Sequence, residues 1–482
     1  MQPSPPQYYI LTLGCQMNVS DSERMAAVLE DIGYTKSKTE QEANLIIVLA
    51  CSVRQSAVNR IYGSIEKWNA LKKKQPLVTV LSGCVLPPDR KKLANHFDII
   101  IDSQQILDLP VKLAKLKNTK IRIANQGLPA KYADNYFAIK PKYTNNFQAY
   151  VPIMTGCNSF CTYCAVPYTR GRESSRTPQE ILHEIALLLT GGFKEITLLG
   201  QIVNKYLVKV DDKFLNWLTK FQRQYKIPKL PELQADYFVN KKIFKFPQLL
   251  ALAASLPGDY WLRYSSPHPK WFNNELIQTL IRYKKIPHHA HLPVQAGHDY
   301  ILRKMLRPYS IMEYKKVITS LRKKIPDITI TTDCIVGFPG ETKKHFQASL
   351  ALFKKIKFDM AYLAQFSSRT GTVAAKMPDD VNKKEKIRRE KELNEVLKQT
   401  ALDNNKKLLG TKQRVLVTNN KKVATSSYVL EGRTVGLKPI RFSAKQNLTG
   451  KFVYIKVTKV SPWHLAGKII KKNCQTIFSA WQ

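Results

Sequence analysis

The stretch GCNSFCTYCAVPYTRGR, residues 156–172, decides what the rest of the chain must build. It places Cys157, Cys161 and Cys164 within eight residues, and no fourth cysteine and no histidine lies close by. A closed zinc site needs four protein ligands, whereas three thiolates can hold an iron–sulfur cluster that keeps one position open for a small molecule. The spacing therefore favours an open iron–sulfur cluster. A zinc site that borrows a distant ligand is the alternative.

Three further cysteines follow predicted strands in the first part of the chain. We expect buried-type strands over 8–14, 44–50 and 77–82, and each leads to one cysteine: Cys15, Cys51 and Cys84. The carboxyl ends of the strands in an open parallel sheet share one edge, where such sheets bind ligands. Three thiols could therefore meet there as a second three-thiolate metal site. Three independent buried cysteines are the alternative.

The composition restricts the classes of partner and compartment. Lys+Arg 77 against Asp+Glu 36 gives a net charge of +41, which points to a polyanion such as nucleic acid, unless the whole proteome is basic. Eight cysteines in 482 residues are too few for a disulfide framework and indicate a reducing cytosol. The N-terminus MQPSPPQ does not resemble a signal peptide, and no apolar run is long enough to span a bilayer.

Helix signals appear at three places. Ser20 and Glu23 could form a capping box that begins a helix at Asp21. Thr177 makes a stronger helix start, because it can cap the helix with Pro178 in the first turn and Glu180 as its capping-box partner. Gly191 and Gly192 are predicted to end that helix. The highly charged segment 381–409 is predicted to be one exposed helix that connects to a last domain.

The central and terminal parts show different repeats. From Tyr150 onward strand, loop and helix alternate, and glycine-rich or polar loops follow the strands, as in a βα barrel. His288, His289 and His291 are interpreted as strand and pocket residues, because alternate strand positions would point the third ligand away. Short strands with separating glycines near the C-terminus indicate a small β-barrel, either an RNA-binding domain or a structural cap.

The predicted fold class is α/β. A doubly wound parallel sheet would occupy 7–125, a partial βα (TIM-like) barrel 143–380, and a small β-barrel 408–472. Residues 207–246, rich in Lys, Pro and aromatic residues, fit no βα repeat and are interpreted as an insertion in the barrel. The insertion could stack on single-stranded RNA or form a helical elaboration that packs on the barrel. Cys334 and Cys474 are interpreted as ordinary residues.

These motifs carry a resemblance over about nine-tenths of the chain. GCNSFCTYC resembles the signature of the radical S-adenosylmethionine enzymes. With GCQMN at 14–18, CSVR at 51–54, GCV at 83–85 and GFPGET at 337–342, the chain resembles the methylthiotransferases. The tRNA branch, often called the MiaB type, is the nearest, because its members show Gln-Met-Asn after the first cysteine. The C-terminal barrel resembles a TRAM domain. Departures from the pattern occur at Leu49, Ala50, Ala296 and Cys334 and in the insertion.

The resemblance implies two 4Fe-4S clusters and S-adenosylmethionine (SAM) as cofactors. It implies six metal ligands, with the second triplet holding the radical cluster and the first an auxiliary cluster that carries sulfur: Cys15, Cys51, Cys84, Cys157, Cys161 and Cys164. SAM would yield a 5′-deoxyadenosyl radical that removes hydrogen from C2 of an adenine, and a methylthio group would be transferred to an isopentenylated adenosine beside the anticodon. Gln201, Arg263 and Gln295 are candidates for the cofactor-binding pocket, because they are expected on loops that follow strands.

The implied partners are tRNA, through its anticodon stem-loop, an electron donor such as flavodoxin or ferredoxin, and a sulfur donor. No membrane is implied, and we expect a cytoplasmic monomer. Two alternatives remain. The same chemistry could act on threonylcarbamoyl-adenosine or on a ribosomal protein, although Gln16 to Asn18 argue against this. A zinc-stabilised RNA-binding protein without catalysis is the alternative from another class.

Overall fold

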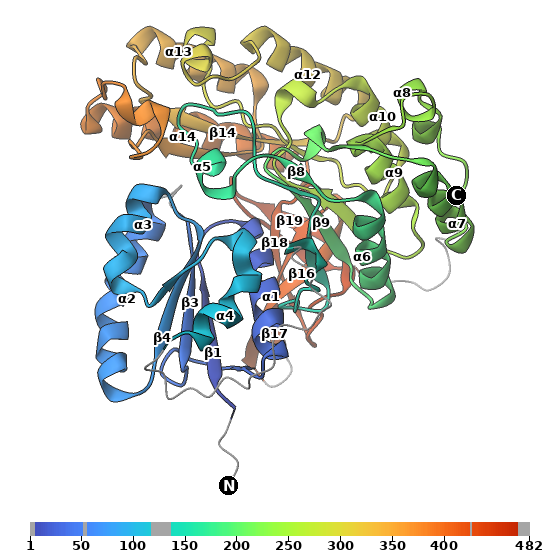
Figure 1. The fold of residues 1–482 in the computed structure, drawn as a ribbon. Helices are drawn as coiled ribbons and strands as arrows, with labels where there is room; N and C mark the ends of the chain where they lie inside the picture. The colour runs from blue at the N-terminus through green and yellow to red at the C-terminus, as the bar shows by residue number, and fades with distance from the viewer. Residues whose placement is uncertain (1–4, 52–54, 117–135, 425–426, 471–482) are drawn as a thin grey trace.

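The chain forms three units, shown in Figure 1, in a computed structural model that describes residues 5–51, 55–116, 136–424 and 427–470. The N-terminal unit carries a parallel sheet, the central unit βα repeats, and the C-terminal unit a closed barrel. In these described ranges no helix combines the length and the apolar character needed to cross a membrane. The α/β fold class and its three architectures are confirmed. The domain limits given above stay predictions.

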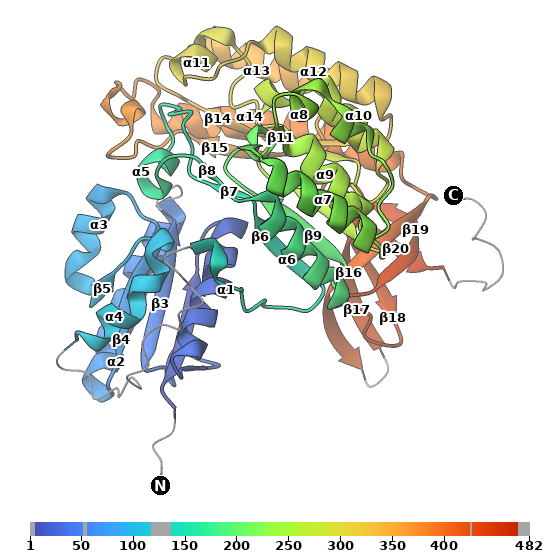
Figure 2. The same ribbon diagram turned by 45° about the vertical axis from the view of Figure 1, so that its right-hand side comes forward.

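The N-terminal unit is a five-stranded parallel sheet in the order β2-β1-β3-β4-β5. Its elements are β1 Gln7–Thr12, α1 Gln16–Asp31, β2 Thr35–Lys36, β3 Leu45–Cys51, α2 Gln55–Lys74, β4 Val78–Cys84, α3 Pro87–Leu93, β5 Ile99–Ile100 and α4 Leu109–Ala114. Strands β3 and β4 are buried along their whole length, because α1 and α4 cover one face of the sheet and α2 and α3 the other (Figure 2). This is the predicted doubly wound sheet.

Helix α1 begins at Gln16 and not at Asp21. The predicted capping box of Ser20 and Glu23 is wrong, since both residues lie inside the helix and are buried. Glu23 instead accepts a hydrogen bond from the backbone N–H of Thr144, at 2.9 Å, in the segment that enters the central unit. The polar residues that resemble a helix start therefore lie on the face of α1 that contacts the segment entering the central unit.

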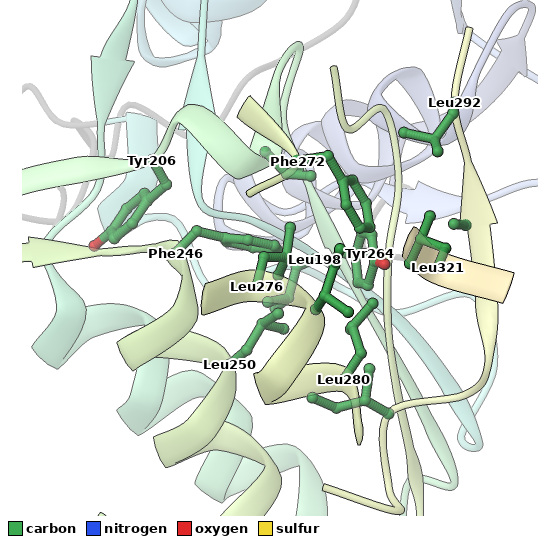
Figure 3. Packing of buried hydrophobic residues seen from close by; sticks show 14 of the residues in the cluster. Leu198, Tyr206, Phe246, Leu250, Tyr264, Phe272, Leu276, Leu280, Leu292 and Leu321 are labelled. Carbon is green, nitrogen blue, oxygen red and sulfur yellow. The ribbon is translucent and has the colours of Figure 1, made fainter. Parts of the chain in front are cut away.

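The central unit contains six parallel strands arranged as β12-β9-β6 and β13-β14-β15. Their bounds are β6 Gln148–Pro152, β9 Glu195–Leu199, β12 Trp261–Tyr264, β13 His289–His291, β14 Thr329–Val336 and β15 Met360–Gln365. Helices α6 Pro178–Thr190, α9 Phe246–Ser255, α10 Asn274–Arg282, α12 Ile311–Lys324 and α13 Lys343–Ile356 alternate with them. Figure 3 shows Leu198 and Tyr264 of neighbouring strands packed with leucine and aromatic side chains of these helices. The Thr177 cap with its Glu180 partner is confirmed.

The insertion consists of β10 Leu207–Lys209, α7 Asp212–Gln224, α8 Asp236–Val239 and β11 Ile243–Lys245. Strands β10 and β11 pair as an antiparallel hairpin. The aromatic side chains of Phe214, Phe221 and Phe244 are at most 5% exposed and belong to the hydrophobic cluster of the central unit. Of the two alternatives, the structure supports a helical elaboration that packs on the barrel, because these rings are not available for stacking on RNA.

Helix α14, Lys383–Lys406, connects the central and C-terminal units. The prediction of an exposed helix is wrong for one of its faces, which is buried against α13 and β15. Arg389 on this face is 5% exposed and pairs with Glu341 of the GFPGET loop at 2.9 Å. A charged segment that the sequence predicts to be solvent-exposed thus contributes one partner of a buried ion pair.

The C-terminal unit is a closed five-stranded barrel in the order β16-β17-β18-β20-β19. Its strands are β16 Lys412–Ala424, β17 Ser427–Thr434, β18 Pro439–Ala444, β19 Phe452–Val460 and β20 Leu465–Ile469. The last strand was not predicted, because Gly467 interrupts its short apolar pattern. Strand β20 closes the barrel by pairing parallel with β18 and antiparallel with β19.

Candidate functional site: two cysteine triplets at one interface

The second triplet lies on a loop closed by a short hairpin. Strand β7 Met154–Thr155 enters the loop, and β8 Ser174–Ser175 pairs with it on the way out. Within the loop, the backbone N–H of Cys157 donates to the carbonyl of Gly171 at 3.2 Å. A Cβ atom on Gly156, whose φ is +74°, would lie 2.0 Å from the carbonyl oxygen of Arg172. The two ends of the loop therefore approach so closely that only glycine fits at this position.

The thiols of this loop form a set that suits a cluster. Cys157 and Cys161 are buried and Cys164 is partly buried. The pKa of the Cys164 thiol is raised to about 12, mainly by burial, and the neighbouring Cys161 and Cys157 act in the same direction, so the three sulfur atoms influence one another. The guanidinium of Arg307 lies 3.6 Å from the sulfur of Cys161 and offers a positive charge to a thiolate. A donor set of three thiolates, with no fourth ligand grouped with them among the described residues, fits an open iron–sulfur cluster.

The first triplet gathers at the carboxyl edge of the N-terminal sheet. Cys51 and Cys84 are the last residues of β3 and β4 and lie opposite each other in the register. Cys15 precedes α1 and is exposed. The pKa of Cys84 is raised to about 11, mainly by burial; the charge of Arg170 acts against this rise, and Cys51 and Cys15 add to it. Ser52 to Arg54 of the CSVR motif lie outside the described residues.

Across the described ranges, no three His, Cys, Asp or Glu side chains are grouped as the ligands of a single metal ion. The ligands of a cluster differ from such a group, because each thiolate needs to reach only its own iron atom at a separate corner.

The two triplets lie on facing sides of one interface. Helix α5 Val166–Arg170, which follows Cys164, packs against β4, and Arg170 at its end reaches Cys84. Both ribbon views show α5 lying above the N-terminal sheet (Figures 1 and 2). On the same side, the loop after β15 brings Gly371 beside Pro88 at the start of α3, where an added Cβ would meet the proline ring at 3.5 Å. Loops of the central unit therefore reach the cysteine edge of the N-terminal sheet at two points.

The three predicted pocket residues have different surroundings. Gln201 follows β9, and its Oε1 is buried without a hydrogen-bond partner among the described residues. Gln295 is 8% exposed, has a φ of +68°, and joins β13 to β14 through backbone hydrogen bonds. Arg263 turns away from the strand ends: its guanidinium pairs with Glu195 at 2.5 Å and donates to the carbonyls of Thr434 and Val435 in the C-terminal barrel. Its placement links two units, and its predicted pocket role has no support from these contacts.

His288, His289 and His291 do not form one site. His289 and His291 each contact the hydroxyl of Thr331, at 3.1 and 2.9 Å, whereas His288 contacts Asp327. These contacts agree with their interpretation as strand residues.

His268, which sequence reasoning passed over, lies after β12 in the SSPHP loop. Its ring is 3% exposed, and Nδ1 accepts a hydrogen bond from the backbone N–H of Lys270 at 3.1 Å. In the neutral ring Nε2 must then carry the proton, and the described residues offer it no acceptor. The pKa of His268 is lowered to about 2, mainly by burial, and the positive charge of Arg307 acts in the same direction. His268 and Gln201 thus present an unused donor and an unused acceptor after two strands of the barrel.

The burial of His268 predicts a specific acid sensitivity. The unfolded chain binds a proton at this residue below about pH 6.5, whereas the folded chain stays neutral down to about pH 2. Stability is therefore lost as the pH falls below about 6.5, by up to roughly 1.4 kcal/mol per pH unit from this residue. We expect His268→Asn, which keeps an acceptor for Lys270, to flatten the pH dependence of the free energy of unfolding between pH 6 and 4. Parallel curves for the two proteins would contradict this.

Two family descriptions match the chain. Residues 7–102 match the description "Uncharacterized protein family UPF0004", and residues 151–353 match the Radical SAM superfamily. Among solved structures, the radical S-adenosylmethionine methyltransferase TsrM from Kitasatospora setae is 11% identical with a TM-score of 0.43, and the alignment covers 75% of this chain and 73% of TsrM.

Curated relatives match over almost the whole length. The tRNA-2-methylthio-N(6)-dimethylallyladenosine synthase of Dictyoglomus thermophilum is 36% identical over 97% of this chain and 99% of its own length. Proteins of the same name from Carboxydothermus hydrogenoformans and Buchnera aphidicola are also 36% identical, each over 96% of this chain and 99% and 98% of their own length. The chain therefore belongs to the family of the tRNA-2-methylthio-N(6)-dimethylallyladenosine synthases, which are radical SAM methylthiotransferases.

Proposed function

We propose that this protein adds a methylthio group to C2 of an isopentenylated adenosine beside the anticodon of tRNA. The observation that carries the proposal is the arrangement of two cysteine triplets on facing sides of one interface, neither of them grouped with a fourth ligand in the part of the chain that the structure describes. The chemistry needs both. A carbon such as C2 of adenine has no acidic proton, so acid and base groups alone cannot prepare it for substitution.

We assign Cys157, Cys161 and Cys164 to a radical 4Fe-4S cluster, and the first triplet, Cys15, Cys51 and Cys84, to an auxiliary 4Fe-4S cluster. When bound, these groups supply the electron that cleaves SAM and the sulfur that is transferred. Four of the six cysteines are buried and Cys164 is partly buried, which limits the access of water to such chemistry and so reduces side reactions.

The polar groups of the pocket would orient the cofactor or the base. Gln201 offers a carbonyl acceptor and His268 an N–H donor, and both are left without partners by the described residues. Asn204 fixes the backbone of His268 with two hydrogen bonds, of 2.8 and 2.9 Å, and so couples the two loops. Gln295 stays a candidate for the same pocket.

Further partners follow from charge and chemistry. The exposed residues Lys421 and Lys422 of β16 support a role of the TRAM-like barrel in binding tRNA, through the anticodon stem-loop. The reaction requires an electron donor such as flavodoxin or ferredoxin and a sulfur donor. We expect a cytoplasmic monomer built from domains at 7–125, 143–380 and 408–472.

The direct test is an anaerobic assay with reconstituted protein, SAM, a reductant and two tRNA preparations. One tRNA carries isopentenyl-adenosine and the other threonylcarbamoyl-adenosine. Mass spectrometry of the digested tRNA should show the methylthio product with the first tRNA and at least about tenfold less with the second, because a site built around one base substituent discriminates by a few kcal/mol. Methylthio product from the second tRNA alone would show that the protein acts on threonylcarbamoyl-adenosine and belongs to that branch of the methylthiotransferases. Bound zinc and no turnover of SAM would support the non-catalytic alternative.

A further inference from the structure

Arg170 crosses the interface between the two triplets. It is the last residue of α5, six positions after Cys164, and is 3% exposed. Its Nη2 donates to Oδ2 of Asp21 at 2.6 Å and to Oδ1 of Asn18 at 3.0 Å, while its Nε lies 3.0 Å from the sulfur of Cys84. The loop that carries one triplet thus ends in a cation that touches a ligand of the other.

Asn18 connects that cation to all three strand ends of the first triplet. Its Nδ2 donates to the carbonyl of Leu13 at 2.7 Å, two residues before Cys15, and to the carbonyl of Ala50 at 2.9 Å, directly before Cys51. The sulfur of Cys84 lies 3.8 Å from its Oδ1. Through its NH2 group this amide therefore holds together the segments that precede Cys15 and Cys51, and Arg170 orients the amide by donating to its Oδ1.

The surrounding charges fix the geometry of Arg170. Asp21 is fully buried and accepts a second hydrogen bond, from the hydroxyl of Tyr136. A buried carboxylate with two donors cannot shift without leaving one of them unpaired. Arg170 is thereby held with Nε aimed at Cys84. A hydrogen bond from a cation to a cluster sulfur stabilises the more negative, reduced form and raises the reduction potential.

We propose that Arg170 is a positioning residue that sets the reduction potential of the auxiliary cluster and holds it in place against the radical site. The inference rests on the proposed function, because it assigns Cys15, Cys51 and Cys84 to a cluster. Asn18 contributes to the same positioning, because it accepts a hydrogen bond from Arg170 and donates to the backbone next to the other two cysteines.

The test uses full-length protein in which Cys157, Cys161 and Cys164 are replaced by alanine, so that only the auxiliary cluster can bind. Iron content and an anaerobic redox titration followed by electron paramagnetic resonance are measured with Arg170, Arg170→Gln and Arg170→Lys. We expect Arg170→Gln to lower the reduction potential and Arg170→Lys, which restores the charge, to recover part of the shift. In the protein with both triplets intact, Arg170→Gln should reduce methylthio product at least tenfold while SAM cleavage continues.

Arg24→Gln is the matched control. Arg24 is a fully buried arginine in the same helix as Asn18 and at the same interface, but its hydrogen bond goes to Ser20 and not to a cysteine or to Asn18. Its loss should lower the unfolding temperature and leave the reduction potential unchanged. Equal potentials for Arg170 and Arg170→Gln, or an equal shift with Arg24→Gln, would overturn the inference while the proposed function stands. If the protein with both triplets binds no iron at the first triplet, the proposed function fails and the inference falls with it.

Discussion

Replacement of Cys157, Cys161 and Cys164 together by alanine is expected to lower the iron content from about eight to about four per chain and to abolish cleavage of SAM. The three thiols share one loop, so their removal leaves no ligand at that site. The other triplet lies on separate strands of another unit and keeps its own ligands. Iron, acid-labile sulfide and the visible spectrum are measured on protein purified without oxygen, and 5′-deoxyadenosine is measured after addition of a reductant.

The complementary variant separates the two sites. With Cys15, Cys51 and Cys84 replaced by alanine, about four irons should again remain. SAM cleavage should continue in this protein, but the methylthio product should disappear, because the assigned carrier of sulfur is gone. Loss of all iron from either variant would mean that the triplets form one site. Zinc in place of iron in the unaltered protein would remove the basis for radical chemistry.

Gly156→Ala is expected to disable the radical site with a single methyl group. The new Cβ would lie 2.0 Å from the carbonyl oxygen of Arg172 and 2.8 Å from that of Gly171, and neither backbone atom can move aside like a flexible side chain. The positive φ of +74° adds a further penalty for any residue with a Cβ. The combined destabilisation of the loop is about 2–5 kcal/mol. We expect iron content to fall by about half and SAM cleavage by at least tenfold.

Gly192→Ala separates the effect of the clash from that of the backbone angle. Gly192 follows helix α6 with a φ of +83°, and an added Cβ there meets nothing within 4 Å. The penalty should be limited to about 1 kcal/mol, with full iron content. If both variants lose iron equally, the loss follows from general destabilisation of the protein and not from the closeness of the two loop ends at Gly156.

Local motifs were enough to predict the βα architecture and much of the site. The cysteines after successive strands could be placed at one sheet edge, because every parallel strand ends on the same side. The cap at Thr177 was predictable, since its partners lie within three residues. Gln201 could be predicted from its place after a strand. His268 also lies in a loop that follows a strand, but it was not predicted, because its distinguishing feature is an unpaired Nε2–H that becomes significant only when the ring is buried.

Side chains whose partners are distant in the sequence were predicted poorly. Ser20 and Glu23 imitate a helix start because polar residues serve equally as caps and as contacts between units. Arg263 lies at the end of a strand, but its guanidinium reaches a barrel that begins about 150 residues later. The charged face of α14 similarly hides the pair formed by Arg389 and Glu341.

The sequence by itself determined the cysteine spacing, the order of strands and helices up to the last barrel strand, and the family to which they belong, because these depend on residues that are neighbours in the chain. Only the tertiary structure decided that Arg170 touches Cys84 and that Asn18 ties the strand ends before Cys15 and Cys51 together. Such contacts join segments up to 152 positions apart. Their existence depends on how two separately folded units pack, and a linear pattern carries no signal for that geometry.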